Sequence, residues 1–122
     1  MTIQALARLK SVAAQNLSEE IYKRIRDLGF VENPGWDGVR YPLFISAYKM
    51  GAKARAKGFD GKAEYHVYHD DRKGSSYSFG TTIFFNKKKL IDLDVPETKD
   101  GGKAVLAGLD KIRAAMMQAL GK

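Results

Sequence analysis

The sequence has no cysteine and no long apolar run. Without thiols the chain forms no disulfide, and it offers neither a thiolate nucleophile nor a cysteine-built zinc site. No stretch approaches the roughly 18 uninterrupted apolar residues that span a membrane. Residues 1–8 also lack the charged-then-apolar order of a signal peptide. We therefore expect a cytoplasmic protein that has no membrane partner.

Enzyme motifs are missing as well. The chain contains no Gly-x-Ser-x-Gly nucleophile elbow, no Gly-x-x-x-x-Gly-Lys-Ser/Thr phosphate loop and no Gly-x-Gly-x-x-Gly fingerprint. Ser75, Ser76 and Ser78 lie near both histidines in the sequence, so composition alone leaves a Ser–His–Asp triad open. On the missing motifs we predict a non-enzymatic protein without a cofactor.

Two pairs of polar residues could in principle bind a metal ion or transfer protons. His66 and His69 differ by three positions on a predicted strand, so their side chains point to opposite faces. Asp92 and Asp94 share a face, about 7 Å apart. That spacing is typical of the solvated side of an amphipathic strand. We predict no metal site and no catalytic residue.

Basic residues are in excess. The chain has 21 Lys and Arg against 14 Asp and Glu, which gives a formal net charge of +7. Such an excess attracts phosphate polymers and anionic surfaces through long-range fields and counterion release. Many small soluble proteins are equally basic without such a partner, so the placement of the charges decides between the two interpretations.

Residues 3–28 are predicted to form a long amphipathic helix. Asn16 followed by Glu19 resembles a capping box, so two shorter helices are an alternative. Gly29 suits the left-handed position that ends a helix. As one helix the segment could pair with a second copy and give a homodimer. The apolar stripe is Ile3, Leu6, Leu9, Ala13, Leu17, Ile21, Ile25 and Leu28.

A loop and a second helix are predicted next. The Asn-Pro-Gly turn at 33–35 and the only tryptophan, Trp36, fall in a loop over 31–42. Pro42 suits the first turn of a helix over 43–57.

Alternating side chains then predict strands at 62–70, 76–85 and about 91–95, joined by short turns. Such short connections favour an antiparallel meander. A last helix follows at about 100–120. The apolar face of the middle strand is Tyr77, Phe79, Thr81, Ile83 and Phe85, and that of the last helix is Val105, Leu109, Ile112, Met116 and Leu120.

We therefore predict one α+β domain over residues 1–122, with the order α-α-β-β-β-α. Residues 3–28 would be the N-terminal helix, and residues 43–120 a helix, three strands and a helix. The expected architecture is a three-stranded antiparallel meander with helices packed on one face.

Lysines interleaved with aromatic residues are the strongest functional signal, because cations hold phosphates and aromatic rings stack on bases. Three of the lysines follow at a four-residue spacing on the predicted second helix, and others lie in the turns. Tyr68 lies on the polar sheet face. The candidate nucleic-acid-binding residues are Lys49, Lys53, Lys57, Tyr68, Arg72, Lys73, Lys87, Lys88, Lys89 and Lys103.

From residue 43 onward, the predicted order of helix, three antiparallel strands and helix is similar to that of double-stranded RNA-binding domains. The resemblance implies contacts to RNA from the first helix, the first strand turn and the basic start of the last helix. The family's Gly-Pro-x-His loop pattern is absent from the turn, which reads Asp-Arg-Lys-Gly-Ser-Ser. The matching cations are Lys49, Lys53 and Lys57, then Arg72 and Lys73, then Lys99 and Lys103.

The leading hypothesis is a small basic protein that binds nucleic acid through its phosphate backbone, with a strong dependence on salt. The alternative is an inhibitor or adaptor that docks on an acidic or apolar protein surface. It would use Trp36 and the N-terminal helix, because aromatic anchors dominate many protein interfaces.

Overall fold

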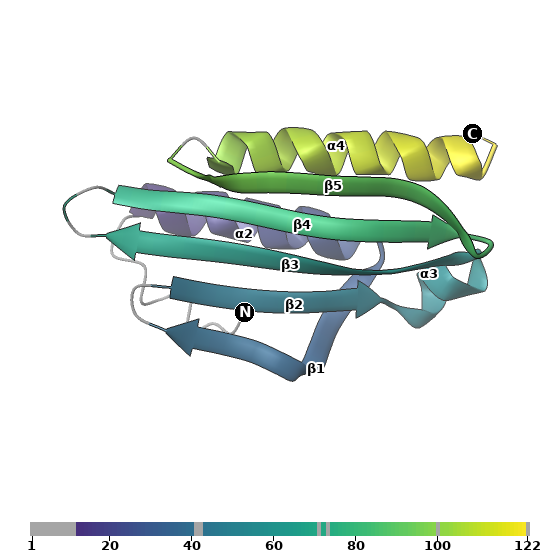
Figure 1. The fold of residues 1–122 in the computed structure, drawn as a ribbon, viewed down its shortest axis with the longest axis horizontal. Helices are drawn as coiled ribbons and strands as arrows, with labels where there is room; N and C mark the ends of the chain where they lie inside the picture. The colour runs from purple at the N-terminus through teal and green to yellow at the C-terminus, as the bar shows by residue number, and fades with distance from the viewer. Residues whose placement is uncertain (1–11, 41–42, 71, 73, 100, 122) are drawn as a thin grey trace.

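The structure is a computed structural model that describes residues 12–40, 43–70, 72, 74–99 and 101–121. Side chains are described except at 12–15, 34–40, 43–45 and 69–70. The elements, drawn in Figure 1, are α2 (Val12–Asp27), β1 (Phe30–Arg40), β2 (Leu43–Met50), α3 (Ala52–Ala56), β3 (Phe59–Asp70), β4 (Gly74–Phe85), β5 (Lys88–Thr98) and α4 (Gly101–Ala119).

The five strands form one antiparallel sheet in the order β1-β2-β3-β4-β5. Each strand is followed in space by the next strand in sequence, so the sheet is a simple meander. Side chains alternate between its two faces. Tyr65 and Phe79, which are opposite each other on β3 and β4, are buried on the face that packs against helices.

The core lies between this inner face and the helices α2 and α4. Ile21 and Ile25 of α2 and Ile112 of α4 have no exposed surface. Figure 1 shows α2 behind the central strands and α4 alongside β5. The helices approach closely at Gly102 of α4, where an added Cβ atom would lie 2.3 Å from a methyl carbon of Leu17. The opposite sheet face carries no described helix, and we call it the open face.

One polar contact lies inside this core. The hydroxyls of Ser18 on α2 and Tyr65 on β3 are 3.2 Å apart and buried. Burial raises the pKa of Tyr65 above its ordinary range, and the hydrogen bond from Ser18 opposes this rise only in part. The ring of Tyr22 meets that of Tyr65 edge-on, with centroids 5.0 Å apart. These contacts fix α2 against the middle of the sheet.

The predicted three-stranded sheet and the order α-α-β-β-β-α are wrong, because two strands precede the three that the sequence revealed. The helix expected at 43–57 is the strand β2 followed by the short helix α3. Ser46, Tyr48 and Met50 are each about 1% exposed, whereas Lys49 between them is exposed. This two-residue alternation belongs to a strand.

The loop expected at 31–42 is mostly the edge strand β1. Its pairing with β2 shifts between Glu32 and Asp37, where β2 advances only from Tyr48 to Ser46. The Asn-Pro-Gly sequence therefore forms a bulge within the strand, a place where an edge strand accepts proline. Trp36 lies in this bulge, and its side chain is outside the description.

The remaining element predictions are close to the structure. The strands at 62–70, 76–85 and about 91–95 correspond to β3, β4 and β5, and the last helix to α4. Gly29 has φ of +104° directly after α2, as expected for a residue that ends a helix. Residues 3–11 of the predicted N-terminal helix lie outside the described residues. In the part of the chain that is described, no helix is long and apolar enough to cross a membrane.

The observed structure also removes the resemblance to double-stranded RNA-binding domains. That resemblance required a helix over 43–57 with its three lysines on one face, followed by a three-stranded sheet. The structure instead has only the five-residue helix α3 before β3, and its sheet has five strands. Lys49 lies on β2, while Lys53 and Lys57 lie in or next to α3.

Candidate nucleic-acid interface

One end of the sheet brings together several separate segments of the chain. Here β2 ends, α3 follows, β3 begins, and β4 turns into β5 (Figure 1). The backbone N–H of Asn86 in the β4–β5 turn donates to the carbonyl of Gly58, 2.9 Å away, just after α3. The rings of Phe59 and Phe85 lie beneath, with centroids 4.8 Å apart. These contacts hold the turn against the α3–β3 connection.

The side chains at this end are predominantly cationic and exposed. We call the set the basic end: Lys49, Lys53, Arg55, Lys57, Lys62, Lys87, Lys88 and Lys89. Two carboxylates lie among them. Asp92 is 3.5 Å from the ammonium of Lys89, and Asp60 accepts a hydrogen bond from the N–H of Gly61 at 2.8 Å. Within the described residues, no other cation of the basic end lies within ion-pair distance of a carboxylate.

Six of these cations were candidates from sequence, and Arg55 and Lys62 were missed. Arg55 stands between Lys53 and Lys57, and only the observed structure shows that it reaches the open face. Lys62 lies directly opposite Lys49 in the β2–β3 pairing. This pairing could not be predicted from the sequence, because residues 43–57 were expected to form a helix.

The β4–β5 turn is unusual in its residues. Asn86 has φ of +50° and Lys87 has φ of +69°, so both adopt the left-handed region. Two-residue hairpin turns of this kind strongly favour glycine at the second position. A non-glycine residue there costs on the order of 1 kcal/mol or more. Lys87 nevertheless occupies this position, and its side chain is exposed at the tip of the turn.

The remaining candidates lie at the opposite end. Arg72 is in the β3–β4 turn, Lys103 is in the first turn of α4, and Tyr68 is near the end of β3. Since β4 has 12 residues, the two ends are separated by about 36 Å. The structure therefore divides the candidate set into two, and only the basic end is a dense cluster. Lys73 lies outside the described residues.

The open face extends from the basic end as a hollow of about 940 Å³. The hollow is lined by the cations Lys49, Arg55 and Lys62 and by the carboxylates Asp60, Glu64, Asp92 and Asp94. The register places Glu64 and Asp94 on either side of Gly80, whose missing side chain forms the floor. The hollow thus changes sign from the cations on β2 and α3 to the carboxylates on β5, with both signs on β3.

The polar residues of the open face form ordinary surface contacts. His66 Nε2 lies 3.2 Å from a carboxylate oxygen of Glu64, and the hydroxyl of Thr82 donates to Asp92 at 3.1 Å. Among the described side chains, no three His, Cys, Asp or Glu residues converge as metal ligands would. The side chain of His69 is outside the description.

No family model, no curated protein and no solved structure matches this chain. A function for this chain is therefore inferred from the geometry of its own residues.

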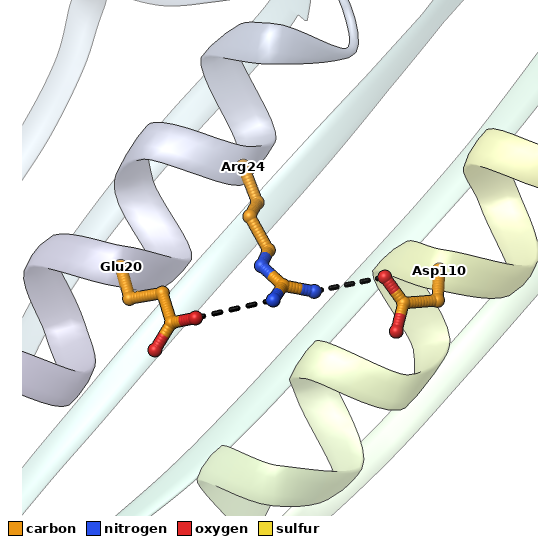
Figure 2. A network of polar contacts seen from close by, with 3 residues as sticks. All are labelled: Glu20, Arg24 and Asp110. Carbon is orange, nitrogen blue, oxygen red and sulfur yellow. Dashed lines mark hydrogen bonds and ion pairs between the residues drawn. The ribbon is translucent and has the colours of Figure 1, made fainter.

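A further arginine lies near α4 but does not extend the basic end. Figure 2 shows Arg24 of α2 between Glu20 and Asp110, at 3.1 Å and 2.8 Å. The two carboxylates compensate its charge locally. The contact links α2 to α4 across the surface and, being exposed, contributes at most about 1 kcal/mol.

Proposed function

We propose that this protein binds nucleic acid through phosphate contacts at the basic end. The observation that supports the proposal is that exposed cations from β2, α3, β3 and the β4–β5 turn lie at the same end of the sheet. Phosphate polymers bind such surfaces because each neutralised phosphate releases condensed counterions. This binding needs clustered charge and does not need a deep pocket.

Two features favour binding over mere solubility. Charges that only keep a protein soluble are usually interspersed with the opposite sign, whereas the basic end contains few carboxylates. Moreover, Lys87 occupies a backbone position at which glycine would be less strained. Backbone strain of this kind is often retained at functional sites.

The test is a fluorescence-anisotropy titration with labelled oligonucleotides at low salt, using two variants of equal net charge. The first, Lys53→Gln/Lys57→Gln/Lys87→Gln, removes three cations from the basic end. The matched control, Lys99→Gln/Lys103→Gln/Lys111→Gln, removes three exposed lysines elsewhere. We expect the first to weaken binding at least roughly tenfold and the control to have little effect.

Equal losses in the two variants would mean that net charge, and not the basic end, governs binding. Absence of binding to any single strand or duplex at micromolar protein would overturn the proposal. A protein partner that is captured after nuclease treatment, and that the basic-end variant still captures, would favour the alternative of a protein-binding module that uses Trp36 and the N-terminal segment.

A further inference from the structure

We infer that the nucleic acid bound is single-stranded and that one of its bases stacks on Phe84, an inference that rests on the proposed function. Phe84 is a large apolar side chain that remains 37% exposed on β4, at the border between the basic end and the hollow. Its neighbours in sequence, Ile83 and Phe85, point into the core, so Phe84 points out of the open face. Exposed aromatic rings beside cations are typical of surfaces that bind single strands.

Charged residues lie on both sides of the Phe84 ring. Its direct cross-strand neighbours are Lys89 on β5 and Asp60 on β3. On β3, Lys62 pairs with Thr82, two positions along β4 from Phe84. Directly opposite and diagonal neighbours have Cβ atoms about 5–8 Å apart. A base on the ring would therefore have the ammonium groups of Lys89 and Lys62 within reach of its adjoining phosphates, and the carboxylate of Asp60 within reach of its amino groups.

The surroundings of the ring leave room for a base. The next outward positions of β4 are Thr82 and Gly80, which are both small. A Cβ atom added at Gly80 would meet nothing nearer than a carboxylate oxygen of Asp94 at 3.8 Å. One side of Phe84 consequently borders the open hollow and is not covered by a larger neighbour.

The sign change across the hollow distinguishes a single strand from a duplex. A duplex carries phosphates on both of its strands, and a duplex seated on the basic end and the hollow would bring some of them over Glu64, Asp92 and Asp94. A single strand can keep its phosphates on the basic end and turn its bases toward these carboxylates. Base amino groups donate hydrogen bonds to carboxylates, whereas phosphates are repelled by them.

The experiment compares three labelled ligands of about 12 nucleotides: a single strand, a duplex, and a single strand with abasic sites. The wild-type protein should bind the normal single strand most tightly. Phe84→Ala should weaken that binding by roughly 5- to 100-fold and leave binding to the abasic strand unchanged. Phe84→Trp should retain it. Tyr68→Ala is the matched control, because Tyr68 is 38% exposed on the same face but near its other end.

A second readout reports stacking directly. A single strand that contains 2-aminopurine should change its fluorescence on binding wild type and not on binding Phe84→Ala at saturating protein. Circular dichroism checks that each variant is folded. This inference would be overturned if single strand and duplex bound with equal affinity and Phe84→Ala left that affinity unchanged. The proposed function would still be supported in that case if the basic-end variant weakened binding. If no ligand binds at all, the proposed function fails as well.

Discussion

If the basic end binds nucleic acid as proposed, the salt dependence of that binding is its most quantitative consequence. Apart from Lys89, which lies 3.5 Å from Asp92, its cations have no carboxylate partner among the described residues. If a single strand contacts four to six of the others at about 0.7 counterions per phosphate, log K should fall with log salt at a slope of roughly −3 to −4. Between 50 and 200 mM salt the affinity would then fall roughly 60- to 250-fold.

The same arithmetic predicts what the basic-end variant does to the slope. Removing Lys53, Lys57 and Lys87 takes away three exposed charges, so the slope should become shallower by about 2. The variant that lacks Lys99, Lys103 and Lys111 should keep the wild-type slope. Anisotropy titrations at five salt concentrations measure both. A wild-type slope shallower than about −1, or one that both variants share, would mean that binding does not depend on phosphate contacts at this surface.

The remaining predictions concern the scaffold. Tyr65→Phe should lower the free energy of unfolding by about 1–3 kcal/mol in urea titrations, because the buried Ser18 hydroxyl loses its partner. The double variant Ser18→Ala/Tyr65→Phe should lower the free energy of unfolding by less than the sum of the two single variants. Burial raises the pKa of Tyr65, so its contribution is complete below pH ~10 and declines at higher pH, where the unfolded tyrosine ionises first. Thermal denaturation from pH 9 to 11 should show this decline, and Tyr65→Phe should reduce it. Gly61→Ala should cost at least about 1–3 kcal/mol, because Gly61 has φ of +149° and an added Cβ would lie 2.3 Å from the carbonyl of Thr82. Gly80→Ala, on the neighbouring strand with nothing nearer than 3.8 Å, should be neutral within about 0.5 kcal/mol.

The sequence predicts best the elements whose periodicity has only one interpretation. Tyr77, Phe79, Thr81 and Ile83 alternate without interruption, and all four are buried on β4. The segment at 43–50 has two interpretations, because its apolar residues fit helical spacing as well as alternation and a proline precedes it. A short apolar run is decided by the neighbours with which it pairs, and these are distant in sequence. The edge strand β1 was missed for a related reason, since its bulge contains the residues that usually mark a turn.

Six of the eight cations of the basic end were predicted from the sequence, but their arrangement was not. An antiparallel meander places consecutive turns at opposite ends, so the separation of Arg72 from Lys87 follows from the predicted strands alone. The predicted strands alone do not place Lys49, Lys53 and Lys57 beside the β4–β5 turn. That placement requires β2 to pair with β3, which was visible only in the structure.

The edges of the sheet are poorly suited to pairing with an added strand, which supports the proposed binding at the basic end and the open face. β1 and β5 are the two outer strands, and each contains a proline, Pro34 in the bulge of β1 and Pro96 on β5. Proline removes a backbone donor, and a bulge interrupts the regular row of N–H and C=O groups that an added strand would need. β5 also carries exposed charged residues along its length. A partner that extends the sheet is therefore disfavoured at both edges. The surfaces that remain are those on which cations and an exposed aromatic ring already lie together, and a flexible polyanion with stacking bases fits them better than another strand.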